Sequence, residues 1–301
     1  MPLDGFEPTP RSAWESVFEK EWKGAPEPAY AHCTSDGFPL HPFYTQEDAD
    51  ALPKGAVAAQ RTAQSRASAY THTLEQLGPG DPKVLNVQAL EALQDGASSL
   101  LFYLHGNEDL TQLLKGIQAN IITIHAVVEG DPEAFLARWK TAWISLGLDP
   151  LEWQGSLNTT VRGDALKSVF AQLPAGVRLA VNAGEFRTQN LPSSPTSSSP
   201  NATALPAVPA LAFALREWDA LFAACGPEVF SRVWVHWTVT DDFMNEVAAL
   251  RALRMVWAHW LNERGVSPAA APLWICAEGI LPADPGNDPH NPLVLTQWQL
   301  I

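Results

Sequence analysis

Residues 100–158 read LLFYLHGNEDLTQLLKGIQANIITIHAVVEGDPEAFLARWKTAWISLGLDPLEWQGSLN, and this stretch decides the fold. It holds three short apolar runs, at 100–106, 121–128 and 151–158, which alternate with segments of helical periodicity. Short runs rich in Val, Ile, Leu and Trp are typical of parallel strands that are buried on both faces. The alternation of strands and helices therefore predicts an α/β fold with a parallel sheet.

The same pattern continues toward the C-terminus, with runs at 177–185 (VRLAVNAGE), 232–240 (RVWVHWTVT) and 272–279 (PLWICAEG). Polar or small residues recur where the predicted strands end, namely at His105, Asn158, Glu185, Thr240 and Glu278. Because the carboxyl ends of barrel strands form the binding mouth, this recurrence favours a (β/α)8 barrel of the TIM type over a doubly wound sheet. Only six strands are visible in the sequence. Either the barrel is incomplete at its C-terminus, with its last units missing or supplied by a partner, or the sheet is open.

The chain is expected to have three parts. Residues 1–82 combine an amphipathic helix at 11–24 with an extended, Pro-rich arm, and residues 83–301 form the barrel. Residues 191–210 (LPSSPTSSSPNATALPAVPA) form a low-complexity Ser/Pro-rich insertion. Such a segment is typical of a flexible surface insertion, and the alternative is a lid over the barrel mouth.

The composition excludes several classes of protein. A chain of 301 residues with 46% hydrophobic and 17% charged residues is globular rather than disordered. A net charge of −14 argues against a nucleic-acid partner, which draws on Lys and Arg. Three widely spaced cysteines, no apolar signal segment and no run of about 18 apolar residues predict a cytoplasmic protein without a membrane partner.

Several residues allow two readings. His105 and His125 lie on predicted strands, where a core or rim histidine is commoner than a ligand, and with Cys276 they make no metal spacing. Arg251 and Arg254 lie on the helix 243–260 and pair with Glu246 or another carboxylate, or else contact a ligand phosphate. Four tryptophans on predicted helices belong to the core or anchor an interface. These are Trp139, Trp143, Trp257 and Trp260.

Read in order, five segments resemble the methylmalonyl-CoA mutase family, and the third is more similar to the small, non-catalytic subunit than to the large one. They are TSDGFPLHPFYTQED at 34–48, NVQALEALQDGASSLLFYL at 86–104, LEWQGSLNTTVRGDAL at 151–166, DDFMNEVAALRALRMVWAHW at 241–260 and DPHNP at 288–292. The resemblance implies a substrate barrel with an N-terminal arm that helps to contain the coenzyme A chain.

The resemblance also implies a role. The family's small subunit is the structural partner of a large catalytic subunit, in a heterodimer that interconverts methylmalonyl-CoA and succinyl-CoA. None of the eight histidines has Asp two positions before it and Gly three positions after it, the pattern that supplies the lower cobalt ligand. We also expect the family's cobalamin domain to be absent after residue 301. The chain alone is therefore expected to bind no cofactor, with adenosylcobalamin in the partner subunit.

The expected site follows from the same resemblance. The family's catalytic Tyr-His pair is matched here by Phe186 and Arg187, or by Glu185 if the alignment moves by one residue. Phe has no hydroxyl and Arg cannot act as an acid, so no catalytic residues are expected. Asn158 stands where the family has a Gln, or it serves only its own turn. The candidate substrate-binding residues are Tyr44, Thr45, Asn158, Phe186 and Arg187.

One alternative from another class of protein stays open. The chain could be an independent acyl-CoA-binding barrel or an enzyme that uses the barrel mouth, since such mouths commonly host chemistry. In that case Arg187 would hold a carboxylate or a phosphate, and Glu185 or Glu278 would act as the base.

Overall fold

The structure is a computed structural model that describes residues 10–21, 23, 32–41, 44–52, 72–184, 186, 206–239 and 242–279. The chain divides into two compact units, Met1–Arg61 and Thr62–Ile301. The first contains helix α1 (Arg11–Glu21), the antiparallel strands β1 (His32–Cys33) and β2 (Pro39–Leu40), and helix α2 (Gln46–Asp50). Helix α1 confirms the predicted N-terminal helix. None of its residues is buried, so its apolar stripe is not part of a core.

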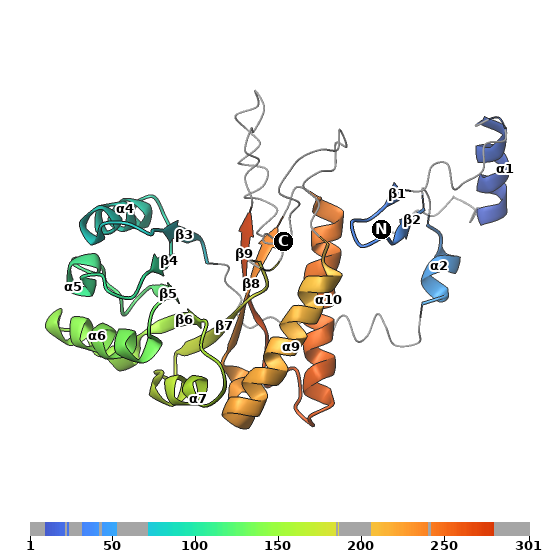
Figure 1. Ribbon diagram of the computed structural model, residues 1–301. Coiled ribbons are helices and arrows are strands. Elements are labelled where there is room, and N and C mark those ends of the chain that lie inside the picture. Colours follow the sequence, from blue (N-terminus) through green and yellow to red (C-terminus); the bar gives the residue numbers. More distant parts are fainter. Residues whose placement is uncertain are drawn as a thin grey trace. The chain divides into compact units, whose positions relative to one another are not determined.

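The second unit is built on a seven-stranded parallel sheet whose strand order follows the chain order. The strands are β3 (Leu74–Leu77), β4 (Ser99–Leu104), β5 (Thr123–Val128), β6 (Gln154–Thr159), β7 (Val177–Asn182), β8 (Val233–Val239) and β9 (Trp274–Gly279). The sheet curls, with helices along its outer side (Figure 1). This order excludes a doubly wound sheet, which reverses direction at a switch point. The fold is α/β, consistent with an incomplete TIM-like barrel.

All six predicted strands are present, and β3 is a seventh that the sequence analysis missed. It pairs with β4 from Leu74 opposite Ser99 to Leu77 opposite Phe102, within the region that we assigned to the extended arm. Its sequence, LEQL, offers one apolar residue at each end, and only Leu77 is buried. Because β3 has a strand on one side only among the described strands, burial leaves little signal in its sequence.

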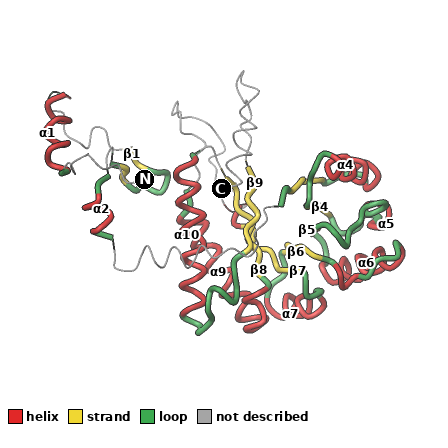
Figure 2. Tube along the Cα trace, turned by 180° about the vertical axis from the view of Figure 1, so that it is seen from behind, coloured by secondary structure: helices red, strands yellow, loops and turns green. Residues whose placement is uncertain are grey.

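The connections are helices on the outer side of the curl (Figure 2). They are α4 (Pro82–Gln94), α5 (Leu110–Leu113), α6 (Pro132–Ser145), α7 (Gly163–Gln172), α9 (Val208–Cys225) and α10 (Phe243–Asn262), with the 3-10 helices η2 (Pro150–Glu152) and η3 (Gly226–Ser231). Asp-Pro pairs start α4, α6 and η2. In each, the Asp carboxylate accepts the N–H two residues on, at 2.8–2.9 Å, and Pro takes the first helical position.

Helix α9 corrects the boundary of the predicted insertion, because it begins at Val208 inside the segment 191–210. Residues 187–205 lie outside the described residues, so the surface and lid readings of that segment both stay predictions. The helix carries Trp218, which packs against Trp257 and Trp260 of α10 at ring distances of 4.8 and 5.9 Å.

The outer core settles one of the open readings, while the pairing of Arg251 and Arg254 with a carboxylate or a phosphate stays a prediction. Trp139, Trp143, Trp257 and Trp260 are all buried, so these four indoles are core residues and not exposed interface anchors. At the seam between α10 and the sheet, Glu246 accepts a hydrogen bond from the Trp237 indole at 3.2 Å. Arg254 donates to the Leu273 carbonyl at 3.4 Å, while Arg251 is exposed.

The strands alternate between two faces. Leu157, Leu179 and Val235 point toward the helices and belong to the apolar core. The residues between them point to the opposite face, which we call the inner face. Register places His125, Ser156 and Arg178 there side by side on β5, β6 and β7. Trp234 and Trp274 are likewise neighbours on β8 and β9, as are His236 and Cys276.

Two histidines on the inner face are buried. His125 hydrogen-bonds to the Ser156 hydroxyl at 2.8 Å and lies 6.3 Å from the His236 ring. Burial lowers the pKa of His236 to about 4. Burial, followed by repulsion from His236, lowers the pKa of His125 well below its usual value. Both rings are therefore neutral near pH 7, and the expectation that His125 is a core histidine is confirmed.

Gly155 is required by the pairing of β5 with β6. It lies opposite Ile124 with φ near +150°, and the Ile124 carbonyl also accepts the Trp153 indole N–H at 2.9 Å. A Cβ on Gly155 would overlap that carbonyl. The two strands can approach this closely only without a side chain.

We expect Gly155→Ala to lower the free energy of unfolding by at least about 3 kcal/mol, because strain at positive φ and the clash with a buried carbonyl add together. Gly147→Ala is the matched control, since Gly147 also has a positive φ, +76°, but open space around it. We expect that control to lose about 1 kcal/mol. Urea unfolding measures both, and equal losses would contradict the close-approach argument.

We expect the free energy of unfolding to fall as the pH drops below 6.5. The reason is that His236 binds a proton in the unfolded state but stays neutral when it is buried in the folded state. A folded pKa of about 4 implies a loss of roughly 2 to 3 kcal/mol between pH 6.5 and 4.5 from this group. In His236→Phe that part of the slope should vanish. Urea unfolding at both pH values measures the difference, with the exposed His259→Phe as control. If the unfolding free energy of His236→Phe depends on pH as that of the wild type does, His236 is not the cause of the loss.

Candidate functional site

A cavity opens where β6 and β7 separate. Their ladder ends at Leu157 opposite Leu179, although β6 continues to Thr159 and β7 to Asn182. Beyond that point each strand stays paired only with its other neighbour. The gap lies at the carboxyl ends of the strands, the side on which parallel α/β folds place their binding sites.

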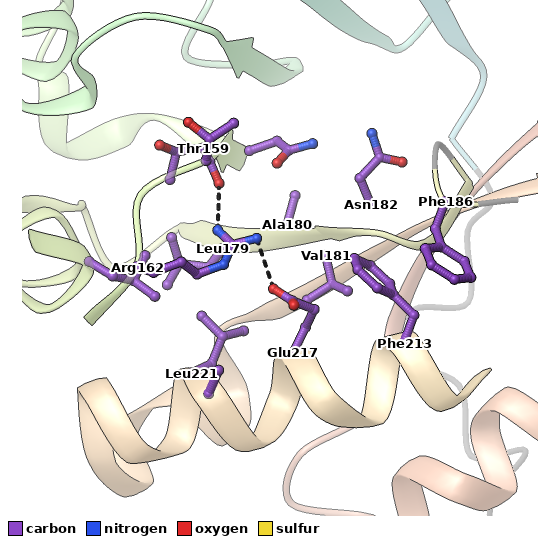
Figure 3. Close-up of a pocket in the computed structure, with 14 residues that line it drawn as sticks. Thr159, Arg162, Leu179, Ala180, Val181, Asn182, Phe186, Phe213, Glu217 and Leu221 are labelled. Atoms are coloured by element: carbon purple, nitrogen blue, oxygen red, sulfur yellow. Dashed lines mark hydrogen bonds and ion pairs between the residues drawn. The ribbon is translucent and has the colours of Figure 1, made fainter. Parts of the chain in front are cut away.

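The cavity has a volume of about 160 Å³ and lies between the two strand ends and helices α7 and α9. In Figure 3, Phe213, Glu217 and Leu221 rise from α9 toward β7. The other lining residues are Asn158, Thr159, Thr160, Arg162, Leu166, Leu179, Ala180, Val181, Asn182, Phe186 and Ala220. Pockets that enclose a cofactor or drug-sized ligand usually measure about 300–1,000 Å³. The cavity therefore has room for a few water molecules or a small group.

An ion pair spans the cavity between the loop after β6 and helix α9. Arg162 contacts Glu217 at 2.9 Å and donates to the Thr159 carbonyl at 3.1 Å (Figure 3). It also donates to the Val161 carbonyl at 2.9 Å. Arg216 reaches the other Glu217 oxygen at 3.2 Å. The Glu217 side chain is only 12% exposed, so two arginines compensate one half-enclosed carboxylate.

The Arg162–Glu217 pair is poorly suited to acid–base catalysis. Arg162 and Glu217 are the titratable side chains among the described residues that line the cavity, and they neutralise each other. General acid–base catalysis needs a group that exchanges a proton near the working pH, and a permanently protonated Arg cannot do so. The cavity therefore offers polar contacts but no proton-transfer pair.

The structure brings two of the predicted site residues together. Asn158 and Phe186 both line the cavity, at the ends of β6 and β7. The Phe186 ring stacks on Phe213 of α9, with 4.8 Å between ring centroids. This contact fixes the ring against the helix. Arg187 and its alternative, Glu185, lie outside the described residues.

The other two predicted residues belong to the N-terminal unit. The Tyr44 hydroxyl accepts the His41 N–H at 3.1 Å, and the Thr45 N–H donates to the Asp48 carboxylate at 2.7 Å. This backbone hydrogen bond holds the pKa of Asp48 below its usual value. Thr45 thereby caps helix α2, and substrate binding by Tyr44 and Thr45 stays a prediction.

The remaining mouth residues are spread along the strand ends. The His105 ring and the Glu129 carboxylate form an exposed hydrogen bond at 2.7 Å, which confirms His105 as a rim residue. Glu278 is half-buried near Cys276, and burial, with a smaller effect of Glu278, raises the pKa of that thiol to about 12. Cys276 is therefore no nucleophile at neutral pH. Among the described residues, no group of three His, Cys, Asp or Glu side chains could hold a metal.

A second, more open groove of about 850 Å³ runs between the edge strand β3 and helix α4. Glu75, Glu91 and Asp95 line it, and none of its lining residues is basic. Val84 lies on its wall, and Val84 and Val87 are each 54% exposed on the same side of α4. An acidic groove of this kind repels phosphates and suits a basic or uncharged segment of a partner.

Sequence reasoning missed the Arg162–Glu217 pair and the polar inner face. The pair joins residues 55 positions apart, and nothing local marks it. A signal for the inner face was present, because Arg178, Ala180 and Asn182 alternate with apolar residues in VRLAVN. Reading such runs as buried on both faces concealed it. Across the described residues, no helix has the length and apolar character to cross a bilayer.

Comparisons with known proteins place these features in context. No protein-family model matches the sequence. The chain is 28% identical over 294 residues to a protein of Porphyromonas gingivalis (strain ATCC BAA-308 / W83) named methylmalonyl-CoA mutase small subunit. The alignment covers 86% of this chain and 45% of that protein, so the chain spans less than half the length of its curated relative.

Among solved structures, a mandelate racemase/muconate lactonizing protein from Herpetosiphon aurantiacus aligns with a TM-score of 0.35 and 14% sequence identity. The alignment covers 74% of this chain and 50% of that one. The sequence relative is thus distant but extends over most of the chain, and its printed name agrees with the resemblance found in the sequence motifs.

Proposed function

We propose that this chain acts as the small-subunit-like structural partner of a catalytic, adenosylcobalamin-dependent methylmalonyl-CoA mutase subunit. In this proposal the partner binds the cofactor and carries out the isomerisation of methylmalonyl-CoA and succinyl-CoA. The observation that carries the proposal is the similarity to a mutase small subunit over 86% of the chain.

The chemistry of the cavity supports a non-catalytic role. Its volume of about 160 Å³ is small for an acyl-CoA, and the one acid among its described lining residues is compensated by two arginines. At the position matched to the catalytic Tyr, Phe186 packs on Phe213 and offers no hydroxyl. These features favour the subunit over the alternative of an independent acyl-CoA enzyme, for which the cavity supplies neither space nor a proton donor.

Among the described strands β3 is an edge strand, and it offers a candidate surface for the partner. An edge strand exposes unpaired backbone groups, and proteins commonly cover such edges. Next to β3, the exposed Val84 and Val87 add apolar area beside the acidic groove. We therefore place the contact with the catalytic subunit at this edge, which we call the β3–α4 edge.

We expect the chain to form a stable heterodimer with a catalytic methylmalonyl-CoA mutase subunit, measured by light scattering after co-expression and by mutase assay. Replacing both Val84 and Val87 by Lys should weaken the complex by about tenfold or more, because two charges would be buried in an apolar contact. Leu151→Lys is the matched control, since Leu151 is 71% exposed in η2, ahead of the amino end of β6.

The possible outcomes separate the hypotheses. Absence of a complex with the wild-type chain, together with unchanged mutase activity, would reject the subunit proposal. A complex that resists the double Val variant but not Leu151→Lys would move the contact away from the β3–α4 edge. Saturable heat on titration of the isolated chain with short acyl-CoAs would favour the independent barrel.

A further inference from the structure

The inner face of the sheet carries a partly buried positive charge, Arg178, that no carboxylate of the described residues compensates. The Arg178 guanidinium lies 4.2 Å from the centre of the Trp274 ring and 6.0 Å from that of Trp234. Its hydrogen bond to the Gly176 carbonyl is long, at 3.5 Å. None of the ion pairs between described residues includes Arg178. Burial lowers the pKa of this guanidinium, which remains charged at neutral pH.

Two other arginines near the sheet have partners. The exposed Arg162 pairs with Glu217, and the half-buried Arg232 donates to the Leu173, Pro174 and Val177 carbonyls at 2.7–3.1 Å. Arg178 is therefore an exception within the same sheet. Because a partly buried charge without an ion-pair partner is costly, its presence favours a bound counter-charge.

Two other side chains on the inner face also have unpartnered polar atoms. The buried atoms without a hydrogen-bond partner include Nε of Arg178, Nε1 of Trp234 and Nε2 of His236. Trp234 is 6% exposed and His236 is 4% exposed, so bulk water has little access to their polar atoms. Each unmet buried group costs about 1–3 kcal/mol, and these three belong to residues on one face of the sheet.

These groups form one cluster. The Trp234 and Trp274 rings stack at 5.5 Å, and His125 lies 4.5 Å from Trp234 and 6.3 Å from His236. Neutral imidazole donates from Nε2 when its proton is there, and indole always donates. The cluster thus combines a fixed cation with two N–H groups and, among its own side chains, no acid.

We propose that this cluster binds a small oxyanion, a carboxylate or a phosphate, through Arg178, Trp234 and His236. The guanidinium fork matches the two oxygens of such a group, and the Trp274 face holds the guanidinium in place. The anion compensates the buried charge and accepts from the unmet donors. The inference rests on the described contacts alone and does not depend on the proposed subunit role.

The test is a titration of the full chain with inorganic phosphate and, separately, with acetate, at an ionic strength held constant with chloride. Binding is followed by calorimetry and by the indole N–H NMR signal of Trp234, which is assigned from its loss in Trp234→Phe. We expect a saturable shift of that signal, with a dissociation constant on the order of 1 mM or tighter for at least one oxyanion. Tighter binding of phosphate identifies a phosphate site, and tighter binding of acetate identifies a carboxylate site.

Variants make the test specific. Arg178→Met keeps most of the side-chain stem and should weaken binding at least tenfold, whereas Arg178→Lys keeps the charge and should weaken it less. Arg216→Met removes an exposed arginine and should bind as the wild type does. A Trp234 signal that neither oxyanion moves would overturn the proposal, as would wild-type affinity in Arg178→Met. If Arg178→Met does not fold, the wild-type titration and Arg178→Lys decide the question.

Discussion

Pairing of parallel strands in chain order is the constraint on which the rest of this structure depends. From Leu74 opposite Ser99 to Val239 opposite Gly279, each strand hydrogen-bonds to the next one along the chain. Because parallel crossovers are right-handed, successive helices fall on the same side of the sheet. The outer face therefore has a large apolar core with the helices. On the inner face, His125 and Arg178 both lie close to the Trp234 ring.

Much of the fold could be predicted from local patterns. Apolar runs predict the six longer strands, and Asp-Pro pairs mark the starts of three helices. The strand β3 could not be predicted in this way, because LEQL at the edge of the sheet has only Leu77 buried. The start of α9 at Val208 was hidden by the Ser/Pro-rich composition before it. Edges and boundaries depend on tertiary partners that a short sequence does not display.

The site was only partly accessible to sequence reasoning. Asn158 and Phe186 were identified through the family resemblance, and the structure places both at one cavity. The Arg162–Glu217 pair depends on the separation of β6 from β7, which follows from sheet geometry and not from any local motif. Arg178 was visible as a lone charge in an apolar strand. Its surroundings could be seen only in the folded sheet, where it lies near the ring of Trp234, whose indole N–H lacks a partner.

The strand order has a further consequence for the dynamics of the sheet. β3 and β9 each have one neighbour among the described strands, while β5 to β7 are flanked on both sides. Opening can therefore proceed inward from either end, one βα unit at a time, as in repeat proteins whose units contact only their neighbours. Backbone amides should then exchange with deuterated solvent in a graded order along the chain, slowest near β6. The central strands therefore stay paired while the strands at either end open transiently.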